Sequence, residues 1–226
     1  MKLVPATESL ARYLSDHATA LDRALLPGES LALEDLRRET LGVIGSEMQI
    51  AREQGSFMYL TAKLIGAQRA LELGCFTGYS AIAVAAALPA NGLLVTIDKD
   101  EVNMGIARRY FARTGQSGKI ITKTGNAQDE LENLFQEYGP ESFDLAFIDA
   151  DKGPMVEYFE HCLKLIRVGG LILADNTLWN GDVTNRSSQD PCTIAIQRFN
   201  DVVSNDPRVE ATLVNVADGI MMLRKK

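Results

Sequence analysis

One stretch, Ala70 to Ser80, constrains the fold more than any other part of the chain; it reads Ala-Leu-Glu-Leu-Gly-Cys-Phe-Thr-Gly-Tyr-Ser. Its apolar start predicts a buried strand that stops at Gly74, and the alanine-rich residues after Gly78 predict a helix. A second apolar run, residues 92–97, ends at Asp98 and completes a strand–helix–strand unit. The chain is therefore expected to form an α/β fold.

The glycine turn and Asp98 belong to the same edge of this predicted sheet. Glycines let the backbone approach a bulky ligand, and an acid on the next strand can accept hydrogen bonds from ribose hydroxyls. The spacing suits an adenosine-bearing ligand; the alternative is a tight turn that binds nothing. Gly74 and Gly78 stand four residues apart, which does not match the GxGxxG dinucleotide fingerprint.

Strands and helices alternate from Arg69 onward. Strands are predicted at 69–73, 92–98, 119–123, 143–149, 170–175, 208–215 and 219–224. Helices are predicted between them at 79–88, 100–114, 128–138, 153–166 and 191–204. Alternation with near-continuous apolar strands indicates a doubly wound, seven-stranded, mostly parallel sheet. The turn Ala217-Asp218-Gly219 predicts an antiparallel last strand.

The first 68 residues show a helical pattern and lie outside this alternation. Apolar residues at helical spacing predict a helix over 6–25, ended by Pro27-Gly28, and a second over 31–45. Residues 46–55 are polar and predict a loop, and Phe57 to Ile65 predicts a short helix. With 226 residues and no internal repeat or linker, the chain is expected to be a single domain, 1–226, with a helical N-terminal extension.

Composition excludes several classes of partner. The formal net charge of −7 disfavours nucleic acid, because phosphate binding needs a basic face. No run approaches the roughly 20 apolar residues of a membrane span. The N-terminus lacks the apolar region of a secretory signal, so a cytoplasmic protein is expected. Three widely spaced cysteines suggest neither a disulfide framework nor a zinc site.

Acidic residues follow three of the predicted strands. Asp98 ends the second strand, Asp149-Ala-Asp151-Lys152 follows the fourth, and Asp175-Asn176 follows the fifth. Because ligands of doubly wound sheets bind beyond the carboxyl ends of the strands, these side chains are expected in one crevice. Asp149, Asp175 and Asn176 are hard oxygen donors that suit Mg²⁺, Mn²⁺ or Ca²⁺.

Lys152 leaves two alternatives open. It can neutralise the acids as an ion pair that caps the sheet, with no cation involved. Beside a divalent cation its amine is instead a candidate general base for a metal-bound hydroxyl. Trp179 can stack on a flat substrate or anchor its loop, and the polar loop 180–189 is a candidate specificity loop.

Four motifs in this order resemble a known family. They are Glu72-Leu-Gly74 to Ser80, Phe147-Ile-Asp149-Ala-Asp151-Lys152, Asp175-Asn176-Thr-Leu-Trp179-Asn180-Gly181, and Asp206-Pro-Arg followed by Asp218-Gly219. They are similar to the cation-dependent, S-adenosylmethionine-dependent O-methyltransferases of the caffeoyl-CoA and catechol O-methyltransferase type, most of all to the caffeoyl-CoA type and its bacterial relatives. The resemblance runs from about Glu39 to the C-terminus. One departure is Gln54, where the family has an acid before its Gly-Gln-Phe-Leu motif.

The resemblance implies a Rossmann-like methyltransferase fold, a homodimer and a small phenolic acceptor with vicinal hydroxyls. It places cofactor contacts at Ile50, Glu72, Gly74, Cys75, Ser80, Asp98, Ala127, Asp149, Asp151 and Tyr158. It implies a divalent cation, Mg²⁺ foremost, on Asp149, Asp175 and Asn176. Lys152 is implied as the base at the catalytic centre, beside Asp149. Substrate contacts fall on Asn180, with Trp179 beside it, and on Lys2.

Two other classes compete with this one. An NAD(P)-linked oxidoreductase is disfavoured because GxGxxG and a Tyr-x-x-x-Lys pair are missing. A non-catalytic nucleotide-binding module is disfavoured because it has little use for a chelating set such as Asp149, Asp175 and Asn176.

Overall fold

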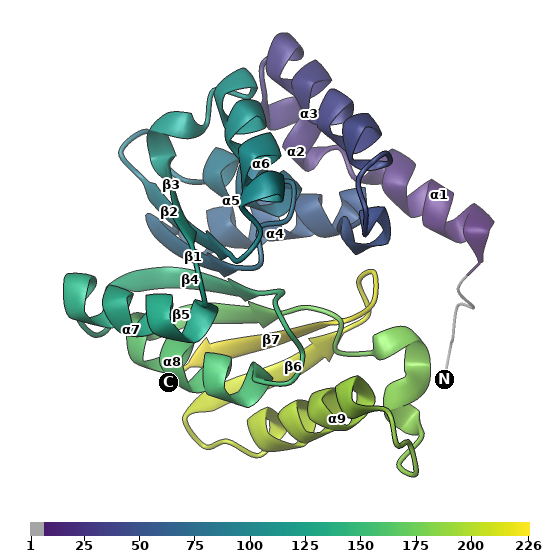
Figure 1. The fold of residues 1–226 in the computed structure, drawn as a ribbon, viewed down its shortest axis with the longest axis vertical. Coiled ribbons are helices and arrows are strands. Elements are labelled where there is room, and N and C mark those ends of the chain that lie inside the picture. Colours follow the sequence, from purple (N-terminus) through teal and green to yellow (C-terminus); the bar gives the residue numbers. More distant parts are fainter. Residues whose placement is uncertain (1–6) are drawn as a thin grey trace.

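A seven-stranded sheet runs through the centre of the computed structural model, which describes residues 7–226 (Figure 1). Its strands are β1 (Arg69–Leu73), β2 (Leu93–Asp98), β3 (Ile120–Thr124), β4 (Phe143–Ile148), β5 (Ile166–Ala174), β6 (Val209–Val214) and β7 (Ile220–Lys225). They are ordered β3-β2-β1-β4-β5-β7-β6. β1 to β5 are parallel, and β7 runs antiparallel to both β5 and β6. The predicted fold class is confirmed.

Helices cover both faces of the sheet. One layer holds α2 (Ala20–Ala24), α3 (Pro27–Thr40), α4 (Arg52–Leu64), α5 (Tyr79–Ala87) and α6 (Glu101–Arg113), with α1 (Glu8–His17) at its end (Figure 1). The other holds α7 (Ala127–Tyr138), α8 (Met155–Leu165) and α9 (Pro191–Ser204). Leu145 and Phe147 of β4 pack into the first layer, whereas Ala146 and Ile148 pack into the second. This alternation explains why a strand buried on both faces reads as one continuous apolar run.

The chain changes face between β3 and β4, so the crevice opens where β1 and β4 lie side by side. α5 and α6 connect β1, β2 and β3 on one face, and the connections from β3 onward lie on the other. Backbone pairing continues past the strand ends, since Asp149 N–H donates to the Leu73 carbonyl at 2.8 Å. Ligand sites of doubly wound sheets lie at this reversal of strand order.

Gly74 is required by this side-by-side packing. It has φ +90°, and a Cβ atom there would overlap the carbonyl oxygen of Asp149. At Gly78, φ is +95° and a Cβ would lie 2.7 Å from the Phe111 ring. Contacts within the protein therefore require glycine at both positions, whereas the sequence suggested only that the glycines make room for a ligand.

The N-terminal boundaries differ most from the sequence predictions. The helix expected over 6–25 is broken between α1 and α2, where the carbonyl of Ala18 accepts a hydrogen bond from Ser56 Oγ at 2.9 Å. Pro27 does not end a helix but begins α3, a position that suits proline because the first helical N–H needs no partner.

Two further boundaries were wrong. The loop expected at 46–55 contains a 3-10 turn, η1 (Ser46–Met48), and the first turn of α4. Gly55 lies within that helix, and its lack of a side chain leaves room for the ring of Tyr79, since a Cβ there would lie 2.7 Å from Tyr79 Cε1. β5 begins at Ile166 and not at 170, because Ile166 pairs with Phe143 before the register shifts. The remaining elements include η2 (Ser117–Lys119) and η3 (Trp179–Thr184).

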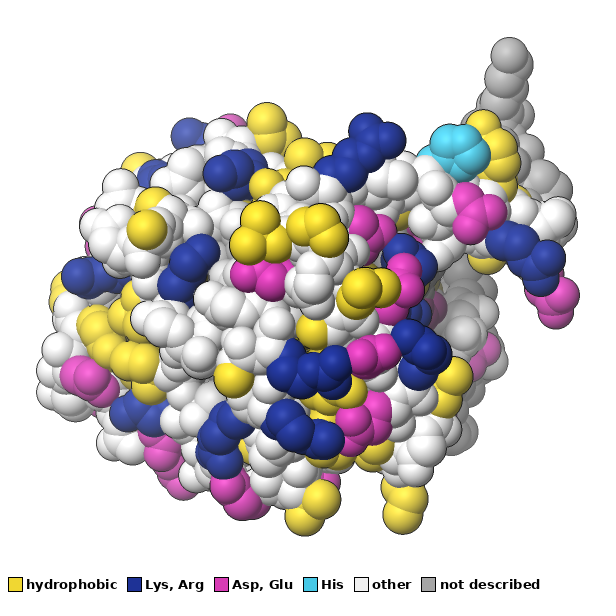
Figure 2. Space-filling view, turned by 90° about the horizontal axis from the view of Figure 1, so that it is seen from above, with side chains coloured by type: hydrophobic (Ala, Val, Ile, Leu, Met, Phe, Trp, Pro, Cys, Tyr) yellow, Lys and Arg dark blue, Asp and Glu magenta, His cyan; other side chains and the backbone are white. Residues whose placement is uncertain are grey.

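Charges of both signs mix on the surface above the first helical layer. Figure 2 shows Lys and Arg side chains next to Asp and Glu side chains on this face. Arg109 pairs with Glu39 at 2.5 Å, and Arg113 pairs with Asp35 at 2.6 Å, which joins α6 to α3. Within residues 7–226, no helix is both long and apolar enough to cross a bilayer.

We expect Gly74→Ala to lower the free energy of unfolding by about 3 kcal/mol or more, because the new Cβ adds overlap with Asp149 to an unfavourable φ. Urea denaturation measures the loss. Gly105→Ala is the matched control: it lies in α6 with open space around its Cβ position and should gain roughly 0.5–1 kcal/mol. A Gly74→Ala variant as stable as wild type would contradict this account.

Candidate active site

A cavity of about 1010 Å³ lies beyond the carboxyl ends of the parallel strands. Most of the predicted site residues line it: Ile50, Gly74, Cys75, Ser80, Asp98, Ala127, Asp149, Asp151, Lys152, Tyr158, Asp175, Asn176, Trp179 and Asn180. Two predicted residues are missing from this wall. Glu72 is buried behind it, and Lys2 lies outside the described residues. The expected convergence of Asp98, Asp149 and Asp175 on one crevice is confirmed.

Asp98 holds the glycine turn at the wall of the cavity. Its Oδ2 accepts hydrogen bonds from the backbone N–H groups of Cys75 and Phe76, both at 2.8 Å. Its Oδ1 accepts from the N–H of Asp100 at 2.9 Å. A carboxylate has about four lone-pair positions, so it retains capacity for one more donor from a ligand. The acid predicted to contact a ribose thus also builds the wall against which that ribose would lie.

Glu72 is fully buried within β1. It faces the same side of the strand as Ala70, toward the layer that contains α5. Thr96 Oγ1 donates to its Oε2 at 2.5 Å, while Oε1 has no hydrogen-bond partner among the described residues. Burial, the largest influence, raises the pKa of Glu72 to about 7.

Asp175 and Asp149 form an acidic pair at the ends of the neighbouring strands β5 and β4. Asp175 is 3% exposed, and its burial and then the charge of Asp149 raise its pKa to about 7. Gln54 Nε2 donates to Asp175 Oδ2 at 2.7 Å, and the N–H of Asn176 donates to Oδ1 at 2.7 Å. Lys152 Nζ donates to Asp149 Oδ1 at 3.1 Å. The ion pair considered for Lys152 therefore forms.

The donor set of this pair fits a hard divalent cation. Residues 7–226 contain no group of three or more His, Cys, Asp and Glu side chains placed around one point. The third oxygen donor at this wall is instead the side-chain amide of Asn176. Two carboxylates and an amide oxygen are ligands typical of Mg²⁺, Mn²⁺ and Ca²⁺. The pKa of Asp175 is raised by burial and then by repulsion from Asp149, and a cation there would offset that repulsion.

The loop after β5 has an unusual backbone. Asn176, Trp179 and Asn180 have φ of 57°, 49° and 52°, the left-handed region that non-glycine residues seldom adopt. Asp218, in the turn between β6 and β7, holds this loop: its Oδ1 accepts from the N–H of Asn180 at 2.7 Å. The fixed backbone places Trp179 and Asn180 at the cavity wall.

Sequence reasoning missed the roles of Gln54 and Asp218. In the sequence, Gln54 stands out only as a departure from the family motif, yet it contacts a residue 121 positions away. Asp218 stands out only as part of a turn. A signal existed for both, since each lies in a motif that the resemblance marks.

Two predicted cofactor residues have other contacts. Asp151 accepts from Lys99 Nζ at 2.7 Å at the exposed rim of the cavity. Cys75 is 2% exposed, and burial raises the pKa of its thiol well above its ordinary value.

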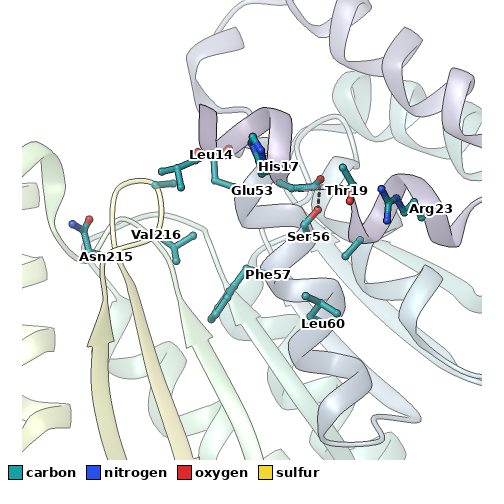
Figure 3. Close-up of a pocket in the computed structure, with 13 residues that line it drawn as sticks. Leu14, His17, Thr19, Arg23, Glu53, Ser56, Phe57, Leu60, Asn215 and Val216 are labelled. Atoms are coloured by element: carbon teal, nitrogen blue, oxygen red, sulfur yellow. Dashed lines mark hydrogen bonds between the residues drawn. The ribbon is translucent and has the colours of Figure 1, made fainter. Parts of the chain in front are cut away.

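A second cavity of about 580 Å³ lies between α1, α4 and the β6–β7 turn (Figure 3). Leu14, Phe57, Leu60 and Val216 supply an apolar wall, and the Ser56 Oγ to Ala18 carbonyl hydrogen bond closes one side. His17 Nδ1 lies 2.7 Å from the carbonyl oxygen of Tyr13, one turn earlier in its own helix. The acidic pair belongs to the larger cavity, where the candidate chemistry is concentrated.

Comparisons with known proteins find similar sequences and similar structures. A family model described as O-methyltransferase matches residues 24–226. Tricin synthase 1 from Oryza sativa subsp. japonica is 38% identical over 234 residues, covering 99% of this chain and 90% of the relative. Catechol O-methyltransferase from Niastella koreensis is 37% identical over 209 residues, covering 92% and 90%. The solved O-methyltransferase from Bacillus cereus in complex with SAH has a TM-score of 0.84 at 32% identity, covering 96% of this chain and 97% of that chain.

Glu72→Gln is expected to change how stability depends on pH. Burial raises the pKa of Glu72 in the folded protein to about 7, whereas the ordinary pKa of a glutamate is 4.5. Wild-type stability therefore falls as the pH rises from about 4.5 through 7. The glutamine cannot ionise. Its stability relative to wild type should therefore rise by about 3 kcal/mol between about pH 4 and pH 8.

Urea denaturation of both proteins at each pH measures this difference, in which the contributions of all other groups cancel. A difference that does not vary with pH would show that Glu72 ionises normally in the folded protein.

Proposed function

The chain belongs to the O-methyltransferase family, and we propose that it methylates one hydroxyl of a vicinal diphenol in a reaction that requires a divalent cation. It is an enzyme that uses S-adenosylmethionine, whose demethylated product, SAH, is bound by the similar Bacillus cereus protein. Membership in this family decides against an NAD(P)-linked oxidoreductase and against a non-catalytic module.

The cofactor proposal rests on the walls of the cavity near β1 and β2. S-Adenosylmethionine supplies an electrophilic methyl group when it is bound. Asp98 would accept from the ribose hydroxyls, while Gly74 and Ser80 line the turn that would hold the methionine end. Ala127, at the start of α7, offers an apolar surface for the adenine, and Ile50, Asp151 and Tyr158 complete the proposed contacts, with Glu72 supporting the wall from behind.

The observation that carries the proposed reaction is the buried acidic pair. Asp149 and Asp175 stand at neighbouring strand ends, and their mutual repulsion is only partly offset by Lys152 and Gln54. A divalent cation on Asp149, Asp175 and Asn176 would supply Lewis-acid polarisation of two adjacent acceptor oxygens. Chelation of this kind selects acceptors with vicinal hydroxyls, which is the basis for proposing a diphenol, with Mg²⁺ as the preferred ion.

Lys152 is the proposed base. Its side chain is 11% exposed, and its Nζ lies beside Asp149, at the wall where the acceptor hydroxyl would be held. A neutral amine there would take the hydroxyl proton while the oxygen attacks the methyl group in line. Trp179 and Asn180 would orient the acceptor ring, and the loop 180–189 would select its substituents.

A homodimer remains a proposal from the resemblance, which light scattering of the purified protein tests.

We expect methyl transfer to a panel of vicinal diphenols to disappear with excess EDTA and to return with Mg²⁺. Asp175→Ala should lower the cation-dependent rate about 10²-fold or more, because it deletes one proposed ligand of the cation. The affinity for S-adenosylmethionine should stay largely intact. Asp98→Ala should weaken cofactor binding instead. Activity that EDTA does not change would be consistent with a methyltransferase but would contradict the proposed cation site.

Two substitutions separate the alternatives for Lys152. Arginine keeps the positive charge but cannot be deprotonated, so Lys152→Arg retains an ion pair with Asp149 and loses a base. If Lys152 is the base, Lys152→Arg and Lys152→Met should both lose about 10²-fold or more in kcat. A nearly active Lys152→Arg beside an inactive Lys152→Met would assign the lysine to charge neutralisation alone.

A further inference from the structure

The β6–β7 turn is bound closely to the loop that carries Asn176 and Asn180. The N–H of Thr177 donates to the Gly219 carbonyl at 3.1 Å, and the N–H of Leu178 donates to the Asp218 carbonyl at 2.9 Å. Gly219 allows this approach, since a Cβ there would lie 2.5 Å from Leu178 Cγ. The two segments therefore form one unit at the cavity wall.

The Asp218 carboxylate adds two contacts to this unit. Oδ1 accepts from the N–H of Asn180 at 2.7 Å, and Oδ2 accepts from Asn176 Nδ2 at 3.4 Å. Asp218 Oδ2 accepts this hydrogen bond, so it is the side-chain NH₂ of Asn176, and not its amide oxygen, that faces Asp218. Because the amide group is planar, its Oδ1 is then turned away from Asp218.

We propose that Asp218 is a positioning residue that fixes the amide of Asn176 with its oxygen, and not its NH₂, available to the divalent cation. This inference rests on the proposed cation site. Metal ligands are commonly oriented by partners that do not touch the metal, and loss of such a partner typically costs 10- to 100-fold in metal affinity. The same carboxylate also accepts from the N–H of Asn180. It therefore links Asn180, which is proposed to contact the acceptor, to Asn176, which is proposed to bind the cation.

Asp218→Asn tests the orientation directly. The amide oxygen introduced by this substitution would keep the bond from the Asn180 N–H, so the new NH₂ would face the NH₂ of Asn176. Two donors cannot bond, and the Asn176 amide would turn over and present its NH₂ to the cation. Combining Asn176→Asp with Asp218→Asn restores the hydrogen bond in reverse, since either oxygen of the carboxylate introduced by Asn176→Asp can bind a cation.

The measurement is the dissociation constant of Mn²⁺ for the metal-free protein, obtained from the paramagnetic resonance of free Mn²⁺ for wild type, both single variants and the double variant. We expect Asp218→Asn to weaken Mn²⁺ binding roughly 10- to 100-fold when Asn176 is present and to cost nothing when it is added to Asn176→Asp. Glu210→Gln, which removes one charge from the exposed end of the same hairpin, should leave binding unchanged.

SAH affinity is the control for folding, and it should stay at the wild-type value in every variant. Unchanged Mn²⁺ binding by Asp218→Asn, or an equal loss with and without Asn176→Asp, would overturn the positioning role while leaving the cation site intact. A wild-type protein that binds SAH but no Mn²⁺ would overturn the proposed cation dependence itself, and with it this inference.

Discussion

The pairing of β4 with β5 sets the chemistry of the cavity. Ile148 lies opposite Ala174, so Asp149 and Asp175 follow side by side at the ends of two parallel strands. The Asp175 N–H donates to the Ile148 carbonyl at 2.9 Å, which prolongs this alignment past the strands. Two carboxylates held in this way repel each other, and burial of one removes the water that would screen them.

The surroundings of the pair are arranged around that repulsion. Gln54 binds Asp175 from α4, Lys152 binds Asp149 from the turn after β4, and Asn176 contributes a backbone N–H. The N-terminal helical layer therefore does more than cover the sheet. α4 is itself held in place, since Ser56 binds the Ala18 carbonyl and Arg37 donates to the Ile50 carbonyl at 2.9 Å.

The alternating part of the chain was predictable because its signals are local. Apolar runs of strand length, followed by glycine turns and helical patterns, placed nearly every element after Arg69 within about two residues. The N-terminal boundaries were not predictable in the same way. At the break, the Ala18 carbonyl accepts a hydrogen bond from Ser56, and within α4 the missing side chain of Gly55 leaves room for the ring of Tyr79. Neither partner is near in sequence.

The sequence by itself determined the doubly wound fold class, the edge of the sheet that carries the candidate site, and the acids at the strand ends. These follow from residue spacing, because parallel strands deliver their carboxyl ends to one edge. Only the tertiary structure decided that Glu72 turns behind the cavity wall, that Gln54 supports Asp175, and that Asp218 faces the Asn176 amide. The last two hydrogen bonds join residues 121 and 42 positions apart, and only the packing of whole layers brings such distant side chains together.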